Sequence, residues 1–208
     1  MGAVDPAGGP VGKQVRKAEE TDVEAISKAL GAAFADDPVM SWLVRDPGRR
    51  PDVLAGNFRM LLEEVWLEHE ATYTTATTSG AAIWDPPGKW SVSIPTQVGL
   101  LPRAFRVWGR NLPRALLTLA KIERGHPTRS HYYLAVLGVE PESQGRGLGS
   151  ALMFPILSRC DADGVPAYLE ASSPRNRALY ERHGFEVTQE FRVGAGAPPI
   201  WGMWRDPK

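Results

Sequence analysis

The sequence predicts a mixed α/β fold, and three observations support this prediction. Strand and helix patterns alternate from residue 130 onward, beginning with an apolar, aromatic-rich strand at 132–139. The N-terminal half adds strand patterns and amphipathic helical patterns of its own. Hydrophobic residues make up 43% of the 208 residues, so the chain can bury a sizeable core. We therefore expect one domain over residues 13–208, preceded by a disordered arm at 1–12 that is rich in Gly, Pro and Ala.

The N-terminal half shows several helical patterns. A capping box at Thr21–Glu24 predicts the start of a helix, whose apolar positions Val23, Ile26, Leu30 and Phe34 recur at helical spacing. Residues 38–47 are predicted to hold a short turn or helix. A longer amphipathic helix is predicted at 51–69, and two helices over 95–124 meet near Pro113.

The strands of this half are shorter. Residues 14–19 and the threonine-rich stretch 71–78 favour strands, and Gly80 is interpreted as a hairpin turn before a strand at 81–84. In the C-terminal half a helix ends at Gly164, and further strands are predicted at 167–171, 185–193 and 199–205. A helix over 174–183 is closed by Gly184.

Composition excludes several classes of function. Acidic and basic residues balance to a net charge of zero and are interspersed, so no basic stripe indicates a nucleic-acid partner. No apolar run reaches the length of a membrane span, and the first residues lack the basic, apolar and small-residue pattern expected of a signal peptide. Cys160 stands alone and the four histidines do not group at metal-ligand spacing. We therefore expect a cytoplasmic protein with no metal, no nucleic acid and no membrane partner.

A glycine-rich run, Gln144–Gly149, lies between a predicted strand and a predicted helix. Unpaired backbone amides and the helix dipole at such a position suit a phosphate or pyrophosphate. Ser150 stands where a dinucleotide fingerprint needs its third glycine, and no Gly-Lys-Ser/Thr of a P-loop is present. The loop therefore indicates another kind of phosphate ligand, or a tight turn that binds nothing.

The motif resembles the coenzyme A signature of the GNAT superfamily of N-acetyltransferases. The resemblance rests on Gln144-x-x-Gly147-x-Gly149, on the preceding Leu137-Gly138-Val139 and on the following Asn176 and Tyr180. Residues 134–189 further resemble the puromycin N-acetyltransferase branch of actinomycetes, as do Ala32–Asp36 and Gly80–Ala82 with Trp84. The resemblance implies a central, twisted, mostly antiparallel mixed sheet flanked by helices. It also implies a coenzyme A-binding core at about 130–190 and acceptor-site helices at about 38–70 and 92–125.

This resemblance implies direct transfer of an acetyl group from acetyl-coenzyme A to a primary amine. The pantetheine arm is expected to pair with the 137–139 strand, and Gly138 is interpreted as a bulge that separates this strand from the one at 167–171. The residues expected to hold the cosubstrate are Leu137, Gly138, Val139, Gln144, Gly145, Arg146, Gly147, Leu148, Gly149, Ser150 and Asn176.

Two residues are expected to carry the protons. Tyr180 is the candidate general acid for the leaving thiolate, since a phenol stays protonated near neutral pH. Glu170 is the first candidate base for the amine, and it lies on the strand expected to border the cleft. Asp36, Asp37 and Glu142 are weaker candidates, and an ordered water or a backbone carbonyl could serve instead. A core tyrosine and a solvated strand carboxylate remain the non-catalytic interpretations.

The acceptor is expected to be a small molecule such as an aminonucleoside or antibiotic, which would make antibiotic resistance a role to test. Phe34, Trp42, Trp84 and Tyr132 are expected to line its cleft. A protein N-terminus or lysine is the alternative acceptor, and an acyl-coenzyme A sensor without turnover is the alternative class. The sequence leaves a monomer and a homodimer equally open.

Overall fold

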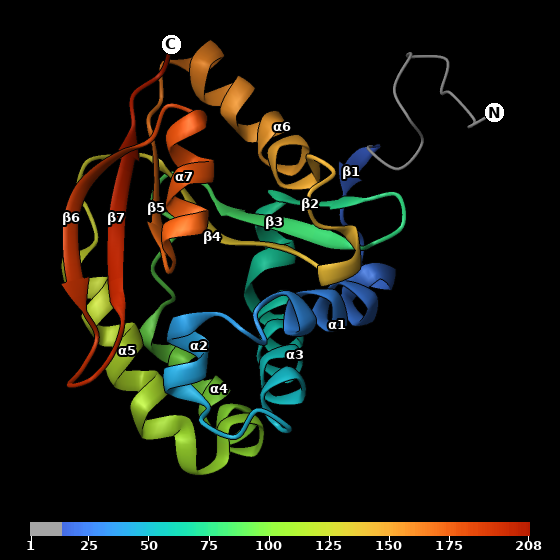
Figure 1. Cartoon of the computed structure of the whole chain (residues 1–208), viewed down its shortest axis with the longest axis vertical. Helices are drawn as coiled ribbons and strands as arrows, with labels where there is room; N and C mark the ends of the chain where they lie inside the picture. The colour runs from blue at the N-terminus through green and yellow to red at the C-terminus, as the bar shows by residue number, and fades with distance from the viewer. Residues whose placement is uncertain (1–13) are drawn as a thin grey trace.

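The computed structural model describes residues 14–208, so the arm expected at 1–12 lies outside the described residues. Within that part of the chain, seven strands form one sheet in the order β1-β2-β3-β4-β5-β7-β6 (Figure 1). The strands are β1 (Val15–Lys17), β2 (Thr72–Thr75), β3 (Gly80–Asp85), β4 (Tyr132–Val139), β5 (Ala167–Ala171), β6 (Glu186–Arg192) and β7 (Pro199–Arg205). The main helices are α1 (Val23–Ala33), α2 (Pro38–Leu43), α3 (Arg50–Leu61), α4 (Ile94–Trp108), α5 (Leu112–Gly125), α6 (Leu148–Asp163) and α7 (Pro174–Arg182).

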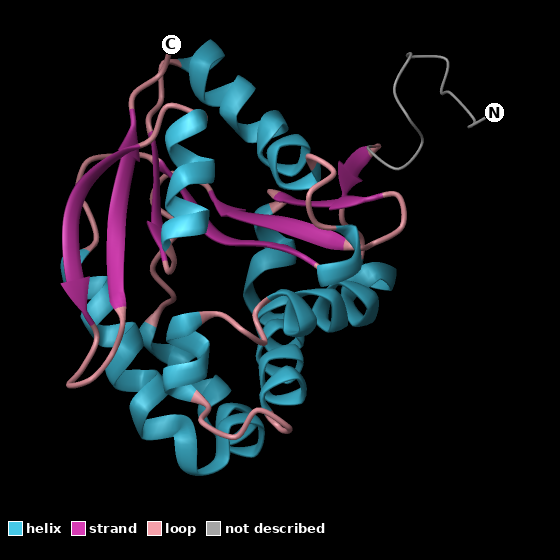
Figure 2. Ribbon diagram, in the orientation of Figure 1, coloured by secondary structure: helices cyan, strands magenta, loops and turns pink. Residues whose placement is uncertain are grey.

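The sheet is mixed. The β4–β5 pair is parallel, and the other neighbouring pairs are antiparallel. Helices pack on both sides of the sheet, as Figure 2 shows in cyan around the magenta strands. The expected mostly antiparallel mixed sheet flanked by helices is therefore confirmed.

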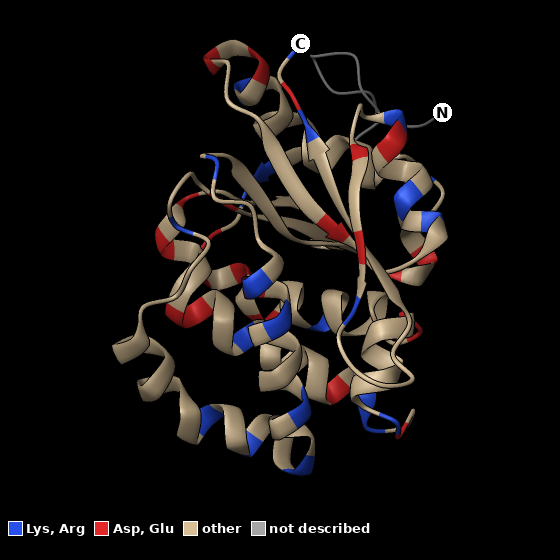
Figure 3. Cartoon of the chain, turned by 90° about the vertical axis from the view of Figure 1, so that its left-hand side faces the viewer, with Lys and Arg blue, Asp and Glu red and all other residues tan. Residues whose placement is uncertain are grey.

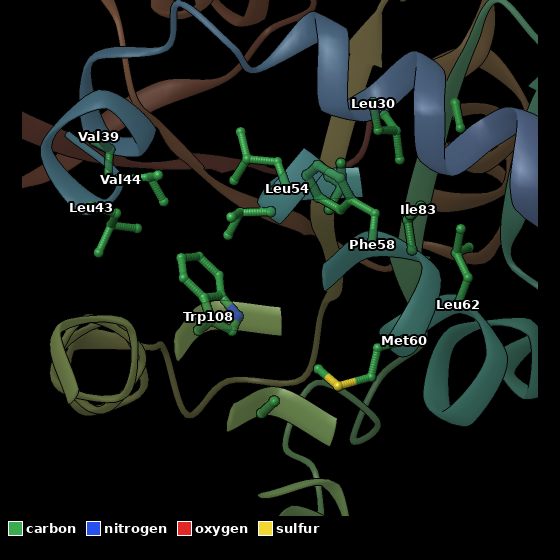
Figure 4. Close-up of a cluster of buried hydrophobic side chains, with 14 of the residues drawn as sticks. Leu30, Val39, Leu43, Val44, Leu54, Phe58, Met60, Leu62, Ile83 and Trp108 are labelled. Atoms are coloured by element: carbon green, nitrogen blue, oxygen red, sulfur yellow. The ribbon is translucent and has the colours of Figure 1, made fainter. Parts of the chain in front are cut away.

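One face of the sheet is covered by the helices of the N-terminal half. Leu54, Phe58 and Trp108 meet there with residues of α1 and α2 (Figure 4). On β3, Ala81 and Ile83 point into this cluster, while Ala82 and Trp84 point into the cluster on the opposite face. Because both faces are covered, every residue of β3 is buried.

The second face is covered by α6 and α7. Leu152, Met153 and Ile156 of α6 pack against Leu134 and Leu169 of the two central strands. Burial of these side chains fixes α6 on the sheet, and its first turn is thereby held against the end of β4. The glycine-rich loop connects these two elements.

A bulge in β4 separates the two central strands. Ile83 pairs with Val136 and Trp84 pairs with Leu134, so Ala135 is the extra residue on β4. Toward β5, β4 pairs only through Tyr132, Tyr133 and Leu134. The strands therefore part directly after the bulge, which leaves the β5-facing edge of β4 open over its second half.

The bulge is not at Gly138, where the sequence analysis put it. A Cβ atom on Gly138 would lie 2.7 Å from Leu30 Cδ2 and 3.0 Å from Phe34 Cε2. Glycine is needed here because α1 packs directly onto the strand. Gly138 thus sets the approach of α1, and Ala135 sets the opening.

Two local predictions are also wrong. The residues that close the first turn before α1 are Glu19 and Asp22, whose carboxylate accepts the Glu19 N–H at 2.9 Å. Glu24 instead pairs with Lys28 at 2.7 Å. Gly80 is the first residue of β3 and not a turn residue, since Thr78 takes the left-handed conformation in the hairpin. The helix predicted at 51–69 runs to His69, but it winds as a π-turn and then a 3₁₀ turn after Leu61.

Candidate active site

The glycine-rich loop forms the N-terminus of α6. Gly145 and Gly147 have φ angles of 75° and 79°, a region that favours glycine, and Gly147 is the N-cap of the helix. A Cβ atom on Gly145 would meet nothing within 4 Å, so open space lies beside this turn. These two residues in the left-handed conformation turn the chain from the end of β4 into the first turn of α6.

The backbone amides of this loop are free. Within residues 14–208, none of the N–H groups from Gly145 to Ser150 donates a hydrogen bond, and the first bond of the helix runs from Ala151 N–H to the Gly147 carbonyl at 3.1 Å. Free amides at a helix N-terminus carry partial positive charge. The exposed Arg146 adds a full positive charge, and residues 144–150 include no carboxylate side chain. This donor set fits a pyrophosphate.

Side chains tie the loop to its surroundings. Gln144 Nε2 donates to the carbonyl of Val139 at 3.0 Å and holds the loop against the end of β4. Ser150 Oγ lies 2.8 Å from His183 Nε2, which connects the start of α6 with the end of α7. Asn176 lies one turn before Tyr180 on α7, and its side chain forms no hydrogen bond within the described residues.

Tyr180 is buried at 6% exposure on α7, next to Phe185. Burial raises the pKa of its hydroxyl above the ordinary value of 10, and the negative charge of Asp37 raises it further. Its hydroxyl forms no hydrogen bond with any described residue. The structure therefore gives a phenol that stays protonated and has no partner of its own.

Asp37 and Ser172 lie beside this phenol. One carboxylate oxygen of Asp37 caps α2 by accepting from Val39 N–H at 2.9 Å, and the other accepts from the hydroxyl of Ser172, directly after β5. Burial raises the pKa of the Asp37 carboxyl, while its hydrogen bonds oppose the rise. Both oxygens are engaged, so Asp37 acts first as a structural link between the α1–α2 connection and β5.

Glu170 lies on β5 one residue beyond Leu169, the last residue that pairs with β4. Its side chain is 8% exposed, and it faces the side of the sheet opposite α6. Oε2 accepts from the hydroxyl of Tyr133 at 2.7 Å. Oε1 is buried and has no hydrogen-bond partner. A carboxylate oxygen without a partner at the point where the strands separate can accept a proton or a donor from a ligand.

The four aromatic residues expected to line an acceptor cleft are dispersed. Phe34 is half-buried at the end of α1 and contacts Phe58, with ring centroids 5.5 Å apart. Trp42 lies on α2, with the Arg114 guanidinium over its ring. Trp84 and Tyr132 are buried in the cluster against α6, because β3 and β4 turn these positions to that face. Their placement does not fit a cleft on the opposite side.

Three residues of the site were not identified from the sequence. Ser172 donates a hydrogen bond to Asp37, and Tyr133 donates one to Glu170. The third residue is His126, whose Nδ1 lies 3.8 Å from Glu170 Oε1. Tyr133 had one usable signal, since strand alternation puts it on the face opposite Tyr132. Ser172 and His126 lie outside helices and strands, where no pattern indicates their partners.

Comparison with known proteins agrees with this geometry. Residues 117–200 match the family model described as an acetyltransferase (GNAT) domain. This segment includes β4, the glycine-rich loop, α6, β5 and α7. An uncharacterized N-acetyltransferase of Schizosaccharomyces pombe is 27% identical over 212 residues, which cover 93% of this chain and 83% of the relative.

Solved structures and a shorter match point the same way. A Corynebacterium glutamicum structure, described as histone acetyltransferase HPA2 and related acetyltransferase, has a TM-score of 0.71 at 25% identity. The match covers 94% of this chain and 96% of that one. A 53-residue segment is 49% identical to the mycothiol acetyltransferase of Beutenbergia cavernae, over 24% of this chain and 18% of that protein.

Together the sheet order, the opening after the bulge and the loop at α6 define an acetyltransferase-type α/β fold. It is the GNAT fold, and residues 117–200 are the segment that matches the family model of that acetyltransferase domain. No helix among residues 14–208 is long and apolar enough to cross a membrane. The same residues contain no group of three or more His, Cys, Asp or Glu side chains arranged to hold a metal ion.

Proposed function

We propose that this protein is an N-acetyltransferase that transfers the acetyl group of acetyl-coenzyme A directly to a primary amine of a small molecule. The observation that carries the proposal is the opening after Ala135, where β4 and β5 part. A loop of free amides lies at one end of this opening. A protonated phenol and a carboxylate oxygen without a partner lie near the end of β5.

The cosubstrate would supply an activated thioester, and the chain would hold its phosphates and its pantetheine arm. The amides from Gly145 to Ser150 would bind the pyrophosphate. The open edge of β4 at Leu137 and Val139 would pair with the pantetheine amides in the manner of an added strand. Gly149 supports this arrangement, since a Cβ there would lie 3.6 Å from Leu179 Cδ2 and 3.9 Å from Leu137 Cδ2. Loop, strand and α7 thus lie within contact distance of one another.

Tyr180 would donate its proton to the departing thiolate. Its raised pKa keeps the proton in place until a strong base forms nearby, and the thiolate is such a base at the moment of C–S cleavage. The unpartnered hydroxyl does not have to break an internal hydrogen bond first. Asp37 would stabilise the protonated phenol in the resting protein by its negative charge.

Glu170 would accept the proton of the attacking amine. Oε1 is its free oxygen, and the hydrogen bond from Tyr133 to Oε2 fixes the orientation of the carboxylate. The amine attacks as the neutral base, so a single proton has to leave its nitrogen. The acceptor would therefore enter from the face of the sheet opposite α6.

A small amine is favoured over a protein acceptor by the enclosed position of Glu170, which is 8% exposed. Two solved structures with the same fold are described as a polyamine N-acetyltransferase of Drosophila melanogaster and an arylalkylamine N-acetyltransferase of Aedes aegypti. Aminonucleosides and amino-containing antibiotics belong to the same chemical class. The Corynebacterium glutamicum structure is described as a histone acetyltransferase, so a lysine side chain of a protein is the alternative acceptor to test beside these small amines.

A panel of amines tests this function. Release of free thiol from acetyl-coenzyme A is followed with puromycin, agmatine, a polyamine, an arylalkylamine and a histone-tail peptide. We expect thiol release with at least one small amine and acetylation of that amine by mass spectrometry. Turnover on the peptide alone would replace the small-molecule acceptor by a protein. Binding of acetyl-coenzyme A with no turnover on any amine would favour a sensor.

A further inference from the structure

Two histidines extend the surroundings of Glu170 into a line of hydrogen-bonding groups. His126 follows the C-terminus of α5, and its Nδ1 lies 3.8 Å from Glu170 Oε1. Its other nitrogen, Nε2, lies 3.0 Å from Nε2 of His131. His131 Nδ1 in turn lies 2.5 Å from the backbone carbonyl of Arg129. At the other end of the line, Glu170 Oε2 accepts from Tyr133.

The ends of this line determine where its protons are. The Arg129 carbonyl can only accept, so His131 Nδ1 must carry a proton and donate it. Burial lowers the pKa of His131, which keeps the ring neutral and leaves its Nε2 with a lone pair. His126 Nε2 faces that lone pair, so it must be the donor of the pair.

One position in the line then lacks a proton. A neutral His126 with its hydrogen on Nε2 has a lone pair on Nδ1. Glu170 Oε1 has lone pairs as well, and it is buried with no partner. Their separation of 3.8 Å is too long for a hydrogen bond, as expected for two acceptors that face each other. One added proton would turn this contact into a hydrogen-bonded ion pair.

The pair is also shielded from water. The His126 side chain is 1% exposed, and the ring of Trp90 is stacked on it with centroids 3.8 Å apart. The rings of Tyr133 and Tyr168 lie nearly perpendicular to the same imidazole, with centroids 4.7 and 5.1 Å away. Inside this low-dielectric surrounding the attraction between an imidazolium and a carboxylate is strong. A proton placed between them would be held without a water molecule.

We propose that Glu170 and His126 together form the site that takes up the proton of the acceptor amine, with His131 as a positioning residue that fixes the tautomer of His126. The inference rests on the proposed acetyl transfer. The amine nitrogen forms the C–N bond, the C–S bond breaks, and Tyr180 passes its proton to the sulfur. The surplus proton of the nitrogen goes to Glu170 Oε1, where it is shared with His126 Nδ1. This proton passes to solvent through the acceptor site once the acetylated product has left, and Tyr180 takes a proton back.

This arrangement predicts how the rate depends on pH. The active form is the one in which the pair lacks the proton, so the rate should rise with pH. The titratable groups that face the pair are Asp85 from β3, Tyr133 from β4, Tyr168 from β5 and His131 itself. His69 Nδ1 lies 2.7 Å from Asp85 Oδ1, so His69 reaches the Glu170–His126 pair only through Asp85.

The first test needs no acceptor and no turnover. Nuclear magnetic resonance follows the ring nitrogen signals of His126, assigned from their loss in His126→Asn. In the wild type we expect the pattern of a ring with its hydrogen on Nε2 and a lone pair on Nδ1. In Glu170→Gln the carboxamide can donate a hydrogen bond to Nδ1, so we expect the Nδ1 signal to shift. An Nδ1 signal that is the same in both proteins would overturn the proposal, whether or not any amine is acetylated.

The second test uses the best amine of the panel at saturating acetyl-coenzyme A. An asparagine at position 126 can offer Glu170 an amide N–H in place of the lone pair. We expect His126→Asn to lower turnover at least tenfold and to shift the rising limb of the pH profile, with unchanged binding of acetyl-coenzyme A in calorimetry. His69→Asn is the matched control and should keep the wild-type limb. A His126→Asn profile that coincides with the wild type would overturn the proposal.

Discussion

Tyr180 combines burial, a raised pKa and a hydroxyl without a partner. Its hydroxyl oxygen does not belong to the fully buried polar atoms that lack a hydrogen-bond partner, so water or a ligand can reach it. Here the ring packs among core residues while the hydroxyl lies close enough to feel the charge of Asp37. This combination is what a proton donor to a transient thiolate requires.

Tyr180→Phe should therefore separate packing from chemistry. The ring remains, so the melting temperature should change little, while turnover should fall by about a hundredfold or more. Affinity for acetyl-coenzyme A should change much less, since the proton matters in the transition state. The measurements are turnover at saturating cosubstrate and a calorimetric titration.

Tyr73→Phe supplies the control, because it makes the same chemical change on a half-buried strand residue at the far side of β3. It should leave turnover intact. Near-normal turnover in Tyr180→Phe would remove the phenol from the mechanism.

Two buried carboxylates should give stability opposite dependences on pH. Burial raises the pKa of Asp85 to about 6 from its ordinary 3.8, against the hydrogen bond of His69. Its protonated form stabilises the folded chain, and that contribution is lost as the pH rises from 3.8 to about 6. The hydrogen bond from Arg16 lowers the pKa of Asp22, so its contribution is present above pH 3.8 and lost as the pH falls.

Melting temperatures of Asp85→Asn and Asp22→Asn, each compared with the wild type between pH 3 and 7, measure these slopes. Relative to the wild type, Asp85→Asn should gain stability as the pH rises. Asp22→Asn should lose stability over the same change. Parallel slopes would show that burial of Asp85 does not control its proton.

At the scale of single elements, the glycine-rich loop and the end of α6 offer a matched pair of positions. Gly145 has a φ of 75° and Gly164 a φ of 66°, and a Cβ on either would meet nothing within 4 Å. An aspartate at either position should cost about 1 kcal/mol for the left-handed backbone. The two positions differ in their place on α6, since Gly145 precedes its N-terminus and Gly164 is its C-cap.

Gly145→Asp should lower the affinity for acetyl-coenzyme A at least tenfold, because it places a carboxylate among the amides that would bind phosphate. Gly164→Asp should leave the affinity unchanged. Isothermal titration of both proteins, with their melting temperatures, decides the matter. Equal affinities would make the loop a turn without a ligand.

The elements predicted best were three strands of the C-terminal half. The bounds of β4, β5 and β7 agree with the sequence analysis, because each is an apolar run with a proline within a few residues of its C-terminal end. The bulge at Ala135 was missed, since a bulge is a matter of register between two strands and an alanine carries no local signal of it. The bulge was wrongly placed at Gly138 for a similar reason. A glycine stands there because of its contact with Leu30, a residue that is distant in the sequence.

The candidate site was predicted in part for a similar reason. The loop and the Asn176–Tyr180 spacing are local motifs, so their arrangement on α6 and α7 could be read from the sequence. Trp84 and Tyr132 point to the α6 face because of strand alternation, which their aromatic character does not reveal. His126 meets Glu170 only through the path of the chain between α5 and β4, and no sequence pattern relates two residues that are 44 positions apart.

At the scale of the whole molecule, α4 and α5 differ from the other helices. Ile94, Val98, Leu101 and Phe105 recur at helical spacing on α4, and all four are exposed, Phe105 by 66%. Further exposed leucines lie on α5. The lower helices in Figure 3 also carry mainly basic positions, and four arginines fall between residues 103 and 114. The opposite side of α4 is buried through Ala104 and Trp108.

This difference should appear as two unequal substitutions on one helix. Phe105→Ser should change the melting temperature little and reduce the binding of a hydrophobic dye. Trp108→Ser should cost about 3–5 kcal/mol, since it empties a buried site and removes a hydrogen bond to Asn57. Equal destabilisation by both changes would show that Phe105 is packed in solution.

The opening between β4 and β5 has a consequence for the time the backbone takes to exchange its amide hydrogens with heavy water. Beyond Leu134, β4 is paired on its β3 side alone. Successive amides of a strand point to alternate edges, so along Val136–Val139 slow and fast exchange should alternate residue by residue. Only Tyr132, Tyr133 and Leu134 of β4 pair with β5. Beyond them, the alternate amides of β4 that point toward β5 have no partner strand. A bound pantetheine arm should erase this alternation, and the strand would then exchange as though it had a neighbour on both sides.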